Sequence, residues 1–163
     1  MFDKLFEWIK TSKLKELDYV DVKDDPVRPE LSLEWRKQLG RKIYGLYDGK
    51  ELAAVMCFAF TNNVPKSVAE LDLFSLDANI QSTHRAGNQG EIAIAYTVWS
   101  KKKGGGKKIV KEVYNMIKKS SHLNRLVTLS PLTDMATKFH LRNGAKLLQV
   151  NEDTQNFEYE VIK

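Results

Sequence analysis

Residues 91–100 read Glu-Ile-Ala-Ile-Ala-Tyr-Thr-Val-Trp-Ser and run directly into Lys-Lys-Lys-Gly-Gly-Gly-Lys-Lys at residues 101–108. Apolar, β-branched and aromatic residues dominate the first segment, which predicts a largely buried strand. After the glycines the apolar period changes to that of a helix, with Ile109, Val113 and Ile117 on one face. This stretch therefore predicts a strand, a glycine loop and a helix, around which the other elements can be placed.

Lysines crowd the loop and the start of the predicted helix: Lys101, Lys102, Lys103, Lys107 and Lys108. A helix N-terminus carries partial positive charge and prefers acidic residues, so stability alone does not favour lysines there. A bound anion explains the pattern, because free N–H groups, the helix dipole and the lysines all attract negative charge. The glycines Gly104, Gly105 and Gly106 allow the backbone to approach that anion closely. A mobile, solvated loop is the alternative interpretation.

The spacing of the glycines excludes two common phosphate-binding motifs. A P-loop requires Ser or Thr after its lysine, but Lys107 is followed by Lys108. A dinucleotide fingerprint requires a third glycine where this chain has Ile109. The remaining pattern, Lys101-x-x-Gly104-x-Gly106, resembles the Gln/Arg-x-x-Gly-x-Gly/Ala loop of the GNAT N-acetyltransferase superfamily, which holds the pyrophosphate of coenzyme A. Lys101 departs from the usual Gln or Arg but keeps a hydrogen-bond donor there.

The composition indicates one globular domain with an anionic partner. With 163 residues, 42% of them hydrophobic, the chain is long enough for a single domain over residues 1–163. The net charge of +5 suits nucleic acid, a membrane surface or a phosphorylated cofactor. Residues 101–119 hold eight lysines and one acid, Glu112. Such clustering favours a specific pocket.

The single cysteine, Cys57, excludes an internal disulfide and a cysteine-rich zinc site, and we predict no metal. It lies in the apolar run 52–60, which indicates a buried, inert thiol. No apolar run approaches the length of a membrane span, and the N-terminus lacks a continuous apolar segment. We therefore expect a soluble cytoplasmic protein with no membrane partner. Its oligomeric state stays open, a homodimer included.

Hydrophobic periods and turn residues predict the other elements. Upstream they are a helix at 1–17, a short strand at 17–22 ended by Asp24-Asp25-Pro26, a helix at 31–39, strands at 41–47 and 52–60 joined by Asp48-Gly49, a short helix at 64–71 and an exposed loop at 79–88. Downstream they are a strand at 125–129, a helix capped by Thr133 and closed by Gly144, and an antiparallel pair at 145–150 and 156–162. The order predicts an α/β (α+β) fold with a central mixed, mostly antiparallel sheet flanked by helices. The GNAT fold has the same order of elements, so the resemblance extends over about residues 41–162.

A second resemblance involves Thr128-Leu129-Ser130-Pro131 and Phe139-His140-Leu141-Arg142-Asn143-Gly144-Ala145. These segments are similar to the catalytic domain of malonyl-CoA decarboxylases, a branch of the GNAT fold with Thr-Leu-Ser-Pro after a strand and Phe-His-Leu-x-Asn-Gly-Ala on a helix. The resemblance implies that Ser130 and His140 are a catalytic pair. The decarboxylases' long helical insertion between these two motifs, and their separate N-terminal helical domain, have no counterpart in residues 1–163. Without the resemblance, Ser130 would begin a turn and His140 would be a packed histidine.

The resemblance also implies how an acyl-coenzyme A would bind. The pantetheine would follow the strand at 92–99, and the pyrophosphate would contact the backbone at 104–107. A backbone N–H of Val98 or Trp99 would polarise the thioester carbonyl. In ordinary GNAT transferases a Tyr at the position of His140 protonates the departing thiolate, and a histidine with a pKa near 6.5 can do the same. Glu91 is a candidate general base, acting through water.

We therefore expect transfer of an acetyl group from acetyl-CoA to an amine acceptor of unknown identity. The alternative is decarboxylation of malonyl-CoA or a related acyl-CoA, with Ser130 and His140 handling the carboxylate and the enolate. A third class is a basic nucleic-acid-binding module. The sequence disfavours it, because Tyr96 and Trp99 lie on a buried strand rather than among exposed lysines, where stacking on bases would need them.

Overall fold

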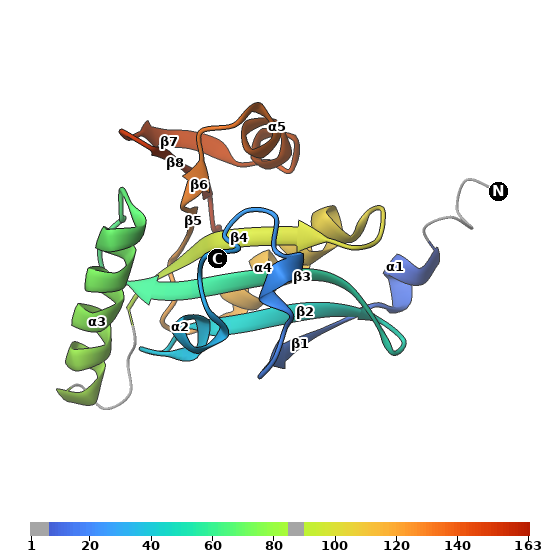
Figure 1. Cartoon of the computed structure of the whole chain (residues 1–163), viewed down its shortest axis with the longest axis horizontal. Coiled ribbons are helices and arrows are strands. Elements are labelled where there is room, and N and C mark those ends of the chain that lie inside the picture. Colours follow the sequence, from blue (N-terminus) through green and yellow to red (C-terminus); the bar gives the residue numbers. More distant parts are fainter. Residues whose placement is uncertain (1–6, 85–89) are drawn as a thin grey trace.

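The computed structural model describes residues 7–84 and 90–163. Their strands form one mixed sheet of order β1-β2-β3-β4-β5-β8-β6, with β7 paired to β8 (Figure 1). The strands are β1 (Lys13–Leu17), β2 (Lys42–Asp48), β3 (Glu51–Thr61), β4 (Ile92–Ser100), β5 (Arg125–Thr128), β6 (Ser130–Pro131), β7 (Lys146–Val150) and β8 (Thr154–Tyr159). The helices are α1 (Glu7–Thr11), η2 (Val22–Asp24), α2 (Leu33–Lys37), α3 (Val68–His84), α4 (Gly105–Lys119) and α5 (Asp134–Arg142). The predicted mixed, mostly antiparallel sheet flanked by helices is confirmed, since only β4 and β5 pair in parallel.

The first half of the sheet is built on the predicted hairpin. Strands β2 and β3 pair down to Asp48 opposite Glu51, and Gly49 in the turn has a φ of 60°, which favours glycine. Strand β1 then pairs with the free edge of β2. Of the helix predicted at 1–17, residues 7–11 are helical, residues 13–17 form a strand instead, and residues 1–6 lie outside the described residues. The strand predicted at 17–22 ends at Leu17. Leu14 and Leu17 have helical spacing, but pairing with β2 forms a strand instead.

Strand β4 is buried on both faces, as its sequence predicts. Ala93 and Ala95 face α4, where Ile109, Val113 and Ile117 complete one hydrophobic cluster. Ile94 and Tyr96 belong to a second cluster, which the segment carrying α2 covers from the other face. This arrangement makes β4 the central strand of the fold.

A bulge interrupts the pairing of β4 with β3. Cys57 pairs with Thr97 but Phe58 pairs with Ala95, so Tyr96 is the extra residue of β4. The Cys57 side chain is fully buried, and burial raises the pKa of its thiol to about 11, as expected for an inert cysteine.

Strands β4 and β5 part halfway along β4. They pair from Ile92 opposite Arg125 to Ala95 opposite Thr128, and the last bond runs from Leu129 N–H to Ala95 O at 2.9 Å. Beyond that point β4 continues beside β3, whereas Ser130 and Pro131 pair with β8. Figure 1 shows the consequence: α5, β7 and β8 lie together at the top of the view, apart from β1 to β3. The sheet is therefore split between β4 and β5.

Helix α5 confirms its prediction, whereas α2 and α3 differ in length from the helices predicted there. Helix α5 has the predicted cap, with Thr133 Oγ1 accepting from Ala136 N–H, and Gly144 follows it with a φ of 100°. Helix α2 is shorter than predicted at 31–39. Helix α3 is longer and continues to His84 where a loop was predicted at 79–88; residues 85–89 lie outside the described residues.

The composition of the buried face of α3 explains why the sequence predicts a loop over its C-terminal part. It is made of Leu71, Ser75, Ala78 and Ser82, all at most 8% exposed, so small and polar residues form much of the buried stripe. The Ser75 hydroxyl is satisfied within the helix by Leu71 O at 2.6 Å. Across the described ranges 7–84 and 90–163, no helix combines the length and the apolar character that crossing a bilayer requires.

Candidate functional site

A cavity of about 760 Å³ lies where β4 and β5 part. Its walls come from residues 95–101 of β4 and the turn after it, from residues 129–131, from one face of α5, and from the loop at 24–27. Apolar side chains predominate, with the Ser130 hydroxyl and the His140 imidazole among them. A mostly apolar cavity of this volume with a few polar groups suits a small organic ligand.

The cavity reaches the N-terminus of α4 at Gly106. Gly104 is the N-cap residue, has a φ of 86° and contributes no side-chain cap. The N–H of Gly105 bonds to Lys102 O at 2.9 Å, but those of Gly106 and Lys107 have no acceptor within the described chain. Two free N–H groups therefore lie at the positive end of a 15-residue helix, an arrangement that suits an anion, and the phosphate site predicted there stays a prediction.

Two of the glycines also pack tightly, a role that the sequence analysis did not identify. A Cβ at Gly105 would lie 2.8 Å from Ser100 Oγ, and a Cβ at Gly106 would lie 2.9 Å from Phe139 Cε1. Any side chain at these positions would push the helix away from β4 and α5. The glycines therefore bring the start of α4 against the cavity wall.

The lysines of this loop differ in their partners. Lys101 Nζ lies 2.7 Å from Asp24 Oδ2, Lys102 Nζ lies 2.6 Å from Asp48 Oδ2, and Lys108 Nζ lies 2.7 Å from Glu112 Oε1. Lys103 and Lys107, by contrast, have no ion pair with any residue that the structure describes. Lys107, whose own backbone N–H is one of the two free groups, thus carries a positive charge that no described acid compensates.

The structure brings Ser130 and His140 to the same cavity but does not bond them to each other. Ser130 Oγ lies 2.8 Å from Thr128 Oγ1. His140 Nδ1 lies 2.8 Å from the hydroxyl of Tyr159, a residue that sequence reasoning missed. No hydrogen bond of Nε2 joins it to any described residue, so this nitrogen is available to a ligand in the cavity.

Burial changes the acid–base character of His140. Its ring contacts those of Phe139, Phe157 and Tyr159, and it is 6% exposed. Desolvation lowers the pKa of His140 to about 4, which corrects the expectation of a pKa near 6.5. Burial likewise raises the pKa of Tyr159 far above its ordinary value, so its hydroxyl keeps its proton. When that hydroxyl donates to Nδ1, the neutral imidazole carries its own proton on Nε2, toward the cavity.

This depressed pKa predicts a dependence of stability on pH. Below pH 6.5 the unfolded chain protonates His140 while the folded chain resists protonation down to about pH 4, so the folded state loses stability as the pH falls. The loss should amount to about 2–3 kcal/mol at pH 4 and should vanish above pH 6.5. Urea unfolding at pH 7 and pH 4.5 measures it. His140→Gln should remove this part of the pH dependence, whereas His122→Gln, at an exposed histidine, should keep it; equal pH dependence in all three proteins would contradict the assignment.

The remaining predicted site residues divide into two groups. Val98, Trp99 and Lys101 line the cavity, and Gly104, Gly105, Lys103, Lys107 and Lys108 flank Gly106 on the same loop. Glu91 is exposed and precedes β4, about 13 Å along the strand from Ala95, the nearest lining residue in the chain. The structure therefore does not bring Glu91 to the cavity.

No protein-family model matches this chain, and neither does any curated protein. Solved structures do. An acetyltransferase from Bacillus subtilis in complex with CoA matches at a TM-score of 0.63 and 11% identity, covering 93% of this chain and 99% of that one. A GNAT-like decarboxylase in complex with isobutyryl-CoA matches at 0.68 and 8% identity, covering 92% of this chain and 100% of that one.

Malonyl-CoA decarboxylase from Agrobacterium vitis matches at a TM-score of 0.58 and 18% identity, covering 83% of this chain. This chain spans only 38% of the length of that decarboxylase. At identities this low, the similarity shows a shared fold but not a shared reaction. The chain has the GNAT fold, which it shares with acetyltransferases and with GNAT-like decarboxylases.

Proposed function

We propose that this protein is an enzyme that binds an acyl-coenzyme A between β4 and β5 and transfers the acyl group, most simply acetyl, to an amine. One observation carries this proposal: a single cavity extends from the N-terminus of α4 at Gly106 to the imidazole of His140. An acyl-CoA has the matching order of groups, with an anionic pyrophosphate, an extended pantetheine and a thioester. The CoA and isobutyryl-CoA bound to two proteins of the same fold support this choice of ligand.

Strand β4 offers the pantetheine a backbone edge. Its residues from Thr97 onward have lost β5 as a partner, so their outward N–H and C=O groups are open to the amides of the pantetheine. Val98 and Trp99 line this part of the cavity. A backbone N–H there would stabilise the negative oxygen that forms when the thioester is attacked, a contribution of about 3 kcal/mol.

His140 completes the reaction. The amine nitrogen attacks the thioester carbon and the C–S bond breaks. Nε2 of the neutral imidazole gives its proton to the departing sulfur and receives the proton that the attacking nitrogen loses, so the imidazole is neutral again at the end. Asp24 is the only acid among the described residues that line the cavity, and it is paired with Lys101. With no free carboxylate to act as a base, the amine arrives neutral or loses its proton to water.

Decarboxylation is the second candidate, because Ser130 and His140 line the same cavity. A catalytic serine and histidine pair would have to meet this condition. The two reactions differ in what they release. Transfer releases free thiol from acetyl-CoA only when an amine is present, whereas decarboxylation releases carbon dioxide from malonyl-CoA without any acceptor. Carbon dioxide release at an enzymatic rate would replace the transferase proposal by this one.

The pyrophosphate position can be tested with two lysines of α4. Lys107 lies in the first turn beside the free N–H groups, and Lys111 lies one turn later; both are exposed. Lys107→Ala should weaken coenzyme A binding about tenfold at low ionic strength, since a charge-assisted contact with the phosphate is lost. Lys111→Ala removes the same charge and should change the affinity less than about twofold. Calorimetric titration measures both, and equal effects would argue against a pyrophosphate at the start of α4.

A further inference from the structure

Arg28 joins β4 to the end of β5 at the point where the two strands part. Its Nε donates to Tyr96 O at 3.3 Å and its Nη2 donates to Leu129 O at 3.1 Å. These bonds come directly after the last ladder bond, from Leu129 N–H to Ala95 O. Tyr96 and Leu129 both line the cavity. The guanidinium thus bridges the two strands just beyond their last pair. It does so through two carbonyl groups that do not take part in the β4–β5 ladder.

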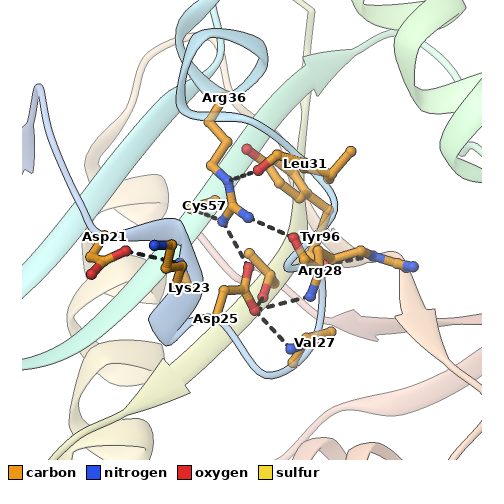
Figure 2. Close-up of polar contacts among 10 residues, drawn as sticks. Asp21, Lys23, Asp25, Val27, Arg28, Leu31, Arg36, Cys57 and Tyr96 are labelled. Carbon is orange, nitrogen blue, oxygen red and sulfur yellow. Dashed lines mark hydrogen bonds and ion pairs between the residues drawn. The ribbon is translucent and has the colours of Figure 1, made fainter.

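The loop that carries Arg28 is fixed by a buried ion pair (Figure 2). Arg36 Nη1 lies 2.7 Å from Asp25 Oδ2, and both side chains are fully buried. Arg36 Nη2 also donates to Arg28 O at 2.6 Å, and Asp25 Oδ1 accepts from Arg28 N–H at 3.0 Å. The loop therefore cannot shift without breaking charge-assisted bonds in the interior.

The same carboxylate reaches the bulge of β4. Asp25 Oδ1 accepts from the hydroxyl of Thr97 at 2.8 Å, and Thr97 follows the extra residue Tyr96. The strand is thus held at two successive residues, at Tyr96 by Arg28 and at Thr97 by Asp25. The residues that follow, Val98 and Trp99, are those proposed to receive the thioester.

Stability alone does not explain an arginine at position 28. Arg28 is 9% exposed and forms no ion pair in the described part of the chain. Burial lowers the pKa of its guanidinium, and the negative charges of Glu30 and Asp25 oppose this effect only in part. Two neutral carbonyl groups compensate the desolvation of a buried charge poorly, and an apolar side chain would fill the same space at less cost. Spanning two acceptors at once, however, requires the planar fork of an arginine.

We propose that Arg28 is a positioning residue of the acyl-CoA site, a proposal that rests on the function proposed above. Arg28 is not among the residues that line the cavity, so it acts through Tyr96 and Leu129. By bonding both carbonyls it sets the separation of the strands at the base of the cavity. That separation orients the backbone from Thr97 to Trp99, along which the pantetheine and the thioester lie.

Arg28→Lys and Arg28→Gln test this role, with Arg125→Gln as the control. Lysine keeps the charge but cannot span both carbonyls. Arg125 also makes two bonds from β5, both of 2.8 Å to Glu158, but at the other end of the strand and outside the cavity wall. Calorimetry compares two probes: acetyl-CoA, and adenosine 3′-phosphate 5′-diphosphate, which lacks the pantetheine and occupies only the α4 end.

Both Arg28 variants should bind acetyl-CoA at least tenfold more weakly and should keep the affinity for the diphosphate within twofold. Arg125→Gln should leave both affinities within twofold of wild type. If Arg28→Gln does not fold, Arg28→Lys decides. Wild-type affinity for acetyl-CoA in Arg28→Lys, or an equal loss for both probes, would overturn the positioning role alone. A wild-type protein that binds neither probe would overturn the proposed function as well.

Discussion

Replacing Asp25 with alanine should lower the free energy of unfolding by about 3–5 kcal/mol. Asp25 is 1% exposed and is the only carboxylate that forms an ion pair with the buried Arg36 in the described residues. Its removal leaves the guanidinium of Arg36 buried without a counter-charge and deprives Val27 N–H, Arg28 N–H and the Thr97 hydroxyl of their acceptor. Because small domains are stable by only about 5–15 kcal/mol, this loss would be a large share of the total.

Urea unfolding of three variants separates the buried pair from an ordinary surface pair. Glu16→Ala removes an acid of the exposed Lys42–Glu16 pair and should cost less than about 1 kcal/mol. The double variant Asp25→Ala/Arg36→Met removes both buried charges and should recover part of the loss, since no charge is then left unpaired. A loss below about 1 kcal/mol for Asp25→Ala would show that this network does not hold the loop in place.

Replacing His140 with alanine should lower kcat about 10²–10⁴-fold, which is the usual contribution of a positioned proton donor. The imidazole is neutral, is held by Tyr159 through Nδ1 and has Nε2 free toward the cavity. Alanine removes the only histidine that lines the cavity among the described residues. Coenzyme A affinity should change little, because the pyrophosphate is proposed to bind the backbone N–H groups at the start of α4 and not the imidazole. Thiol release from acetyl-CoA, measured with a panel of primary amines, gives the rate.

Two further variants test whether the loss of kcat is specific to the imidazole of His140. Tyr159→Phe keeps Nε2 but removes the hydroxyl that holds Nδ1, so its loss of kcat should be smaller than that of His140→Ala. His122→Ala changes an exposed histidine and should leave kcat unchanged. A His140→Ala enzyme with undiminished kcat would exclude His140 as the proton donor in either reaction.

Local chemistry explains which parts of the fold could be predicted from sequence. The buried strand ending at Ser100, the turn at Gly49 and the cap at Thr133 each depend on residues within a few positions of one another. The segment at 13–17 was misassigned because an edge strand forms only when β2 is there to pair with it. Helix α3 was cut short because part of its buried face is made of serines.

The candidate site shows the same division. Ser130, His140 and the glycine segment carry recognisable motifs, and the structure places them on one cavity. Tyr159 could not be predicted, because its bond to His140 depends on how β8 packs against α5. Arg28 was missed for a related reason: its partners Tyr96 and Leu129 are 68 and 101 residues away in the chain, and its own neighbours indicate only a turn.

A crystal structure determined in the presence of coenzyme A tests the central claim most directly. We expect density for the cofactor between β4 and β5, with the pyrophosphate on the N–H groups of Gly106 and Lys107 and the thiol near His140. Coenzyme A bound elsewhere on the protein would contradict this account. So would an empty cavity at saturating coenzyme A.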